Sequence, residues 1–165
     1  GTCHMAKLGA LSALAVTAAL LFSPAAFAGD AEIAYLQSLA GSYTGAGRVS
    51  GPDGGDVSCK VVMKASGTRL NYSGRCTAPG NSTAQSFSGA IRYSDQRRRY
   101  ESSSGARIVP GQKSGSTLTF VTQMEPIQGD VNSTMSVSPS SLKMQFRVTD
   151  KDGATHQGSI PFRKG

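Results

Sequence analysis

The chain has 165 residues, with 20 glycines, no tryptophan and only 7% aromatic residues. Abundant glycine and serine favour many short strands and tight turns, and they argue against a mainly helical protein. The formal net charge is +7. A basic protein of this kind contacts anionic lipids or glycans, or simply gains solubility from its charge, and no specific nucleic-acid target is expected.

The N-terminal residues are predicted to lie outside the folded domain. Residues 1–4 read as vector-derived because the first methionine is Met5. A lysine, an apolar run over 8–22 and a small-residue cleavage pattern indicate a signal peptide over 5–28. The run is shorter than the roughly 20 residues of a spanning helix. We therefore expect one domain over 29–165, periplasmic or secreted, with no transmembrane segment in the mature chain.

The first elements predicted after this leader are a short helix and a strand. Apolar residues at helical spacing predict a helix over 31–40, with Asp30 as its cap and Gly41 after its end. Period-two alternation of apolar and polar residues then begins, and it predicts a strand over 42–49.

The next two strands form the best-defined hairpin of the sequence. Alternation is clear over 56–65 and 70–77, with a turn at Ser66-Gly67 between them. Cys59 and Cys76 both fall on the apolar faces and oppose each other when the hairpin folds. Directly opposed strand residues can come within disulfide reach. We therefore predict a Cys59–Cys76 disulfide, as expected in an exported protein.

Further strands continue the pattern to the end of the chain. They are predicted over 85–94, 98–103, 117–123, 130–137, 142–149 and 155–163. Each has one apolar face, which must be buried by closing the sheet or by packing two sheets. We predict an all-β fold, a single antiparallel β-barrel of about eight strands with a short N-terminal helix. A β-sandwich is the alternative. An outer-membrane barrel would need longer strands, of about 9–11 residues, and aromatic girdles.

The start of the first strand suggests a family resemblance. Leu39-Ala40-Gly41-Ser42-Tyr43-Thr44-Gly45 resembles the Gly-x-Trp opening of lipocalins and related calycin barrels, with Tyr43 at the Trp position. Those barrels place a basic residue of the last strand over that ring, and Arg163 is the candidate here. The resemblance extends to small periplasmic barrels that inhibit metalloproteases. It implies a binding protein with a small apolar ligand in the barrel.

Three alternative roles can be distinguished by structure. A cavity lined by aromatic residues would favour ligand binding, and the candidate lining residues are Tyr43, Tyr72, Phe87, Phe120 and Phe146. A filled core would favour a role of the outer surface in the cell envelope. A free N-terminal arm over 29–40 would favour protease inhibition.

The densest basic cluster is a candidate anion-binding patch for a lipid or glycan. It consists of Arg92, Arg97, Arg98, Arg99 and Arg107, interleaved with Tyr93 and Tyr100. Arginine forks bind phosphate and carboxylate, and a neighbouring aromatic ring can stack on a flat ligand. The alternative is a charged edge strand that discourages aggregation.

No catalytic, metal-binding or cofactor-binding set is predicted. His156 reads as a solvated loop histidine, and Asp150 and Asp152 read as turn residues. The chain is therefore expected not to be an enzyme. Asn71, Asn81 and Asn132 match the N-glycosylation pattern, which matters only in a eukaryotic secretory pathway.

Overall fold

The computed structural model describes residues 29–52, 54–78, 84–124 and 129–165. The predicted leader over 5–28, residues 1–4, which are predicted to be vector-derived, and Asn81 lie outside the described residues. In the described part of the chain, no helix is long and apolar enough to cross a membrane.

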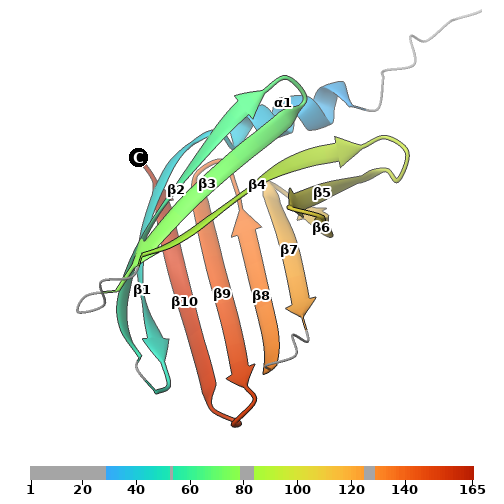
Figure 1. Ribbon diagram of the computed structural model, residues 1–165. Helices are drawn as coiled ribbons and strands as arrows, with labels where there is room; N and C mark the ends of the chain where they lie inside the picture. Colours follow the sequence, from blue (N-terminus) through green and yellow to red (C-terminus); the bar gives the residue numbers. More distant parts are fainter. Residues whose placement is uncertain (1–28, 53, 79–83, 125–128) are drawn as a thin grey trace, which may run out of the picture.

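One helix and ten strands make up the described fold, and the strands close into a single antiparallel barrel (Figure 1). Consecutive strands pair in chain order, and β1 closes the barrel against β10. The prediction of an all-β barrel with a short N-terminal helix is confirmed, and the sandwich alternative is wrong. The elements are α1 (Asp30–Ser38), β1 (Gly41–Ser50), β2 (Gly55–Ser66), β3 (Arg69–Thr77), β4 (Gln85–Ser94), β5 (Arg99–Ser104), β6 (Arg107–Ser114), β7 (Thr117–Met124), β8 (Gly129–Val137), β9 (Ser141–Asp150) and β10 (Thr155–Lys164).

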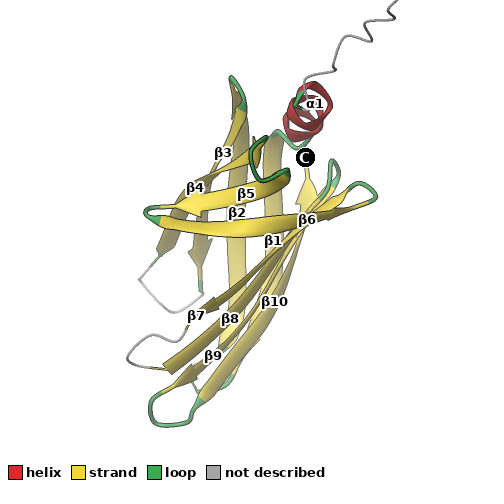
Figure 2. Ribbon diagram, turned by 90° about the vertical axis from the view of Figure 1, so that its right-hand side faces the viewer, coloured by secondary structure: helices red, strands yellow, loops and turns green. Residues whose placement is uncertain are grey.

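The predicted count of about eight strands is too low, chiefly because sequence analysis has no strand at β6. Pro110-Gly111 reads as a turn, since proline lacks the N–H that a strand donates to its neighbour. In the structure Pro110 lies opposite Glu101 within the sheet, and Gly111 lies between Tyr100 and Phe120. Figure 2 shows β5 and β6 running across the direction of β7 to β10.

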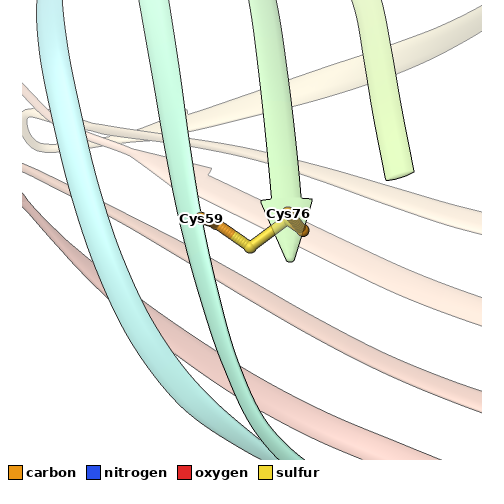
Figure 3. Close-up of a disulfide and its surroundings, with 2 residues drawn as sticks. All are labelled: Cys59 and Cys76. Carbon is orange, nitrogen blue, oxygen red and sulfur yellow. A yellow bond between two sulfur atoms is a disulfide. The ribbon is translucent and has the colours of Figure 1, made fainter. Parts of the chain in front are cut away.

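The predicted hairpin and disulfide are confirmed. β2 and β3 pair so that Cys59 lies directly opposite Cys76, with 4.1 Å between their Cα atoms (Figure 3). Cys59 shares the inward face of β2 with Val57, Val61 and Met63, all of them buried. The disulfide therefore joins neighbouring strands on the inside of the barrel wall.

Helix α1 covers one end of the barrel. Leu36 and Leu39 are buried there, and Tyr43 lies beneath them with no exposed surface. The Tyr43 hydroxyl donates to the Leu39 carbonyl at 2.6 Å. Burial, with a smaller effect of Tyr35, raises the pKa of Tyr43 to about 12. This end of the barrel is therefore closed.

The basic residue over the Tyr43 ring is Lys164, not Arg163. Tyr43 pairs with Lys164 across β1 and β10, and the Lys164 Nζ lies 5.8 Å from the centre of the ring. The same Nζ donates to the Ser38 carbonyl at 3.2 Å, which attaches the end of α1 to β10. Alternation along β10 directs Arg163 to the outside, so the expected partner is wrong by one residue.

The hydrophobic core gathers at the end that α1 covers. The strand ends nearest the helix supply its most buried residues, namely Met63, Leu70, Ile91, Leu118, Val137, Leu142 and Phe162. Toward the opposite end, the inward residues Phe87, Met135, Met144 and Phe146 are only partly buried. The barrel is thus filled at one end and hollow farther along.

Candidate functional site: a cavity inside the barrel

A cavity of about 390 Å³ occupies the barrel interior below the core. Inward residues of seven consecutive strands line it: Tyr72, Phe87, Ser102, Ser104, Arg107, Val109, Phe120, Thr122, Ser133, Met135 and Met144. Cavities that hold small molecules range from about 300 to 1,000 Å³ and combine apolar walls with a few polar groups. This cavity has both properties.

The cavity exists because its aromatic rings lie against the wall instead of filling the centre. The Phe87 ring covers Gly74 directly across β3 and β4, and the Phe120 ring covers Gly111 across β6 and β7. A Cβ built at Gly111 would lie 2.5 Å from Cε1 of Phe120, closer than side chains tolerate. Glycine is therefore required wherever a ring packs flat on the neighbouring strand.

The same pairing recurs around the barrel. Tyr72 lies over Gly89, Phe162 over Gly45 and Phe146 over Gly158, and every pair is directly opposed across two strands. Tyr72 is further held by its hydroxyl, which lies 3.1 Å from the Ser102 Oγ. The wall is therefore preorganised, and a ligand does not have to displace loosely packed rings.

The polar groups of the cavity are hydroxyls and one guanidinium. Ser102, Thr122 and Ser133 present hydroxyls, and Arg107 stands at the start of β6 beside the turn from β5. Among the described residues that line the cavity, Arg107 is the one charged side chain. Met135 and Met144 supply flexible apolar surface opposite. The arrangement suits a molecule with an apolar body and a polar or anionic end.

The predicted lining residues divide into two groups. Tyr72, Phe87 and Phe120 line the cavity. Tyr43 lies in the closed end under α1, and the Phe146 ring packs on Gly158 outside the set that lines the cavity.

Sequence analysis misses the contribution of β5 and β6 to the cavity. Ser102, Ser104, Arg107 and Val109 are lining residues that it does not identify as such. Arg107, Val109 and Gly111 alternate along the chain. If a strand through Pro110 is allowed, this alternation identifies Arg107 and Val109 as inward-facing residues.

The five arginines of the predicted patch do not form one surface. Arg97 and Arg99 approach Glu101, with Arg97 Nη1 3.1 Å from both carboxylate oxygens and Arg99 Nη2 3.6 Å from Oε2. Arg92 lies opposite Glu101 on β4. Arg107 lines the cavity, whereas Arg98 and Arg99 line a separate pocket beside α1.

Glu101 explains why part of the cluster is structural. It faces outward on β5, yet its side chain is only 1% exposed because arginines cover it. Burial alone would raise the pKa of Glu101, but the Arg97 hydrogen bond and charge, the Ser94 hydrogen bond and the Arg99 charge outweigh it and lower that pKa. The carboxylate is therefore ionised, and it pairs with Arg97 and, at a longer distance, with Arg99.

The remaining predicted residues take local roles. Asp150 Oδ1 accepts from the backbone N–H groups of Asp152 and Ala154 at 3.0 and 2.9 Å, which confirms the turn. His156 belongs to β10 instead of a loop, with its Nε2 3.9 Å from Asp150 Oδ2. Asn71 and Asn132 are exposed on β3 and β8.

Comparison with known proteins adds information through structure alone. No protein-family model and no curated protein matches the sequence. The crystal structure of Rv2717c from M. tuberculosis matches with a TM-score of 0.58 and 13% identity, covering 81% of this chain and 97% of that chain. The S-type phycobiliprotein lyase CPES from Guillardia theta matches with a TM-score of 0.57 and 10% identity, covering 80% of this chain and 91% of that chain.

The second match overturns the expectation that the chain is not an enzyme. A lyase is an enzyme, and this one has the same kind of barrel. The lack of a recognisable catalytic set in the sequence is therefore no ground for excluding catalysis on this scaffold. At such low identities both matches establish the fold alone, and that fold is a closed antiparallel β-barrel.

Proposed function

We propose that this chain is an exported binding protein whose barrel holds a small molecule with an apolar body and an anionic end. The observation that carries the proposal is the cavity of about 390 Å³, kept open by aromatic rings that lie over cross-strand glycines. A barrel that needed no ligand would gain stability by filling this space with side chains.

The two alternative roles have less support from the geometry. A filled core would favour a role of the outer surface, and the interior is hollow below the core. A free N-terminal arm would favour protease inhibition. The segment instead forms α1, with Leu36 buried in the barrel core and Tyr35 donating to the Ser116 carbonyl at 2.7 Å.

Arg107 is proposed to recognise the anionic end. A hydrogen bond between guanidinium and a carboxylate, sulfonate or phosphate is about twice as strong as one between neutral groups. The described lining residues include no carboxylate that would compete for this arginine. The apolar body would lie against Met135, Met144 and Phe87, where its burial is favourable by about 25 cal/mol per Å².

Export is proposed together with the binding role. A disulfide persists in oxidising compartments such as the periplasm or the extracellular space, and Cys59 and Cys76 are bonded. The signal-peptide pattern over 5–28 supports the same location. An apolar or amphipathic compound of the cell envelope is the ligand class expected there.

A pair of matched fluorescent probes tests the proposal. N-phenyl-1-naphthylamine is neutral, and 8-anilino-1-naphthalenesulfonate has the same ring skeleton with one sulfonate. Both should bind saturably with one molecule per chain. Arg107→Gln should lower the affinity for the sulfonate probe by about tenfold or more and should change the affinity for the neutral probe by less than about twofold.

The control is Arg163→Gln, which removes the same charge from the outer face of β10 and should leave both affinities unchanged. Failure of both probes to saturate would overturn the cavity as a binding site. An equal loss of both probes in Arg107→Gln would overturn the role of this arginine as the anion contact.

A further inference from the structure

A second pocket, of about 360 Å³, lies between α1 and the strands β4, β5 and β6. It shares no lining residue with the barrel cavity. Gly111 forms part of this pocket, whereas Phe120, whose ring covers Gly111, lines the barrel cavity. The two spaces therefore lie near one another but are separately lined. We call this second space the tyrosine pocket; its lining residues are Ala31, Glu32, Tyr35, Tyr93, Arg98, Arg99, Tyr100, Gly111 and Lys113.

Three tyrosines form a fixed aromatic wall in this pocket. The rings of Tyr93 and Tyr100 are 5.1 Å apart and those of Tyr35 and Tyr100 are 5.7 Å apart, each pair in an edge-to-face arrangement. Tyr35 is held by its hydrogen bond to the Ser116 carbonyl. Rings fixed in this way offer faces and edges to a flat ligand at little cost in conformational entropy.

The same pocket carries more positive than negative charge. Arg98, Arg99 and Lys113 line it, against the carboxylate of Glu32. Part of the Arg99 charge is already paired with Glu101, whose Oε2 lies 3.6 Å from Arg99 Nη2. The Lys113 Nζ lies 4.7 Å from the centre of the Tyr35 ring, so the cation is held over the aromatic wall. In the part of the chain that the structure describes, Arg99 Nε is buried and has no hydrogen-bond partner.

The backbone at Arg98 also points to a role other than turn formation. Arg98 has φ of 52°, and among the described residues it is the one non-glycine residue with a positive φ. A side chain in this left-handed region is strained, and glycine or asparagine is the usual residue. At this strained position the arginine side chain lies among the residues that line the pocket.

From these observations we infer that the tyrosine pocket binds a small aromatic anion. Its ring packs on Tyr93, beside the buried Tyr100, and its carboxylate or phosphate is held by Arg98, Arg99 and Lys113. The inference goes beyond the proposed function, because this site lies outside the barrel cavity and does not use Arg107. Part of the predicted arginine and tyrosine cluster lines this pocket, namely Arg98, Arg99, Tyr93 and Tyr100.

The test uses four small probes in calorimetric or NMR titrations. Phenyl phosphate and benzoate carry both a ring and an anion, inorganic phosphate carries only the anion, and phenol carries only the ring. One of the two aromatic anions should bind with one site per chain, at least about tenfold more tightly than phosphate or phenol. Whichever of the two binds more tightly identifies the preferred anion.

Variants then locate the binding site and separate binding from folding. Arg98→Gly and Lys113→Gln should each lower the binding affinity for the aromatic anion by about tenfold. Arg98→Gly should also leave the melting temperature unchanged or raise it, because glycine relieves the positive φ. Arg163→Gln, on the outer face of β10, is the control that should leave this affinity unchanged.

Three outcomes would overturn the inference. The first is that neither phenyl phosphate nor benzoate binds more tightly than inorganic phosphate, which would mean a diffuse charge effect. The second is unaltered binding in both Arg98→Gly and Lys113→Gln. The third is loss of the aromatic anion in Arg107→Gln, which would place the ligand in the barrel. Binding of N-phenyl-1-naphthylamine, measured in the same variants, reports on the barrel site separately.

Discussion

Adding one methyl group at Gly74 should close the barrel cavity without unfolding the barrel. A Cβ built at Gly74 would lie 2.5 and 2.7 Å from Cε2 and Cε1 of Phe87, and closer still to Cζ. Carbon atoms in ordinary contact are about 3.5–4.0 Å apart. The far end of the ring must therefore move inward by more than about 1 Å, given the present separation of 2.5 Å at Cε2.

The energetic effect should be modest and the effect on binding large. Overpacking a filled core costs about 1–3 kcal/mol, and here the ring moves into empty space, so the lower end applies. A loss of about 1 kcal/mol lowers the melting temperature by roughly 2–4 °C in a domain of this size. The shifted ring occupies the space of the ligand, so N-phenyl-1-naphthylamine should bind at least about tenfold more weakly.

The assay is fluorescence titration of that probe together with thermal unfolding followed by circular dichroism. Gly55→Ala is the matched control, because the same methyl at Gly55 would meet nothing within 4 Å. The double variant Gly74→Ala/Phe87→Leu should recover most of the binding, since the smaller side chain restores the space. Full probe affinity in Gly74→Ala, or a loss in Gly55→Ala of equal size, would refute the role assigned to the ring and the glycine.

Three further predictions concern stability and titration. Replacing Cys59 and Cys76 by serine should cost about 3 kcal/mol for a loop of this length and lower the melting temperature; an unchanged value under oxidising conditions would contradict the stabilising role. The arginines lower the pKa of Glu101 in the folded protein. Its contribution to folding stability should therefore be complete above the ordinary carboxyl pKa of about 4.3. That contribution should be lost as the pH falls through the lower pKa of the folded state. Urea unfolding as a function of pH should show this loss, and Glu101→Gln should remove it; identical acid slopes in both proteins would contradict the pairing. The pKa values of Tyr43 and Tyr100 are both raised to about 12, chiefly by burial, so stability should fall as pH rises from about 10 toward that value. Absorbance titration at alkaline pH should show late ionisation in the folded state, and ordinary titration of every tyrosine would contradict it.

The sequence predicts those parts of the fold where local pattern and pairing agree. The β2–β3 hairpin alternates cleanly, has a glycine turn and places Cys59 opposite Cys76, so strand positions and register follow together. The end of β10 shows the limit of this approach. Choosing between Arg163 and Lys164 as the partner of Tyr43 requires the register of β1 against β10, which joins the two ends of the domain. Alternation along β10 places Arg163 on the outside, but it does not show which residue lies opposite Tyr43.

The site is harder to predict because it depends on which strands lie beside each other. A glycine in a strand pattern can mark a bend, a bulge or a close approach. Only the pairing of β6 with β7 shows that Gly111 makes room for Phe120. Arg107 likewise reads as part of a surface cluster until β6 is recognised as a strand through Pro110, which turns its side chain toward the cavity.

The central claim is that the barrel interior is an open, preorganised site for a small molecule. A crystal structure of the protein soaked with N-phenyl-1-naphthylamine tests it most directly. The account predicts one probe per chain inside the barrel, touching Phe87, Met135 and Met144, with the rings still flat on their glycines. Side chains filling that space, or the probe bound only on the outer surface, would contradict it.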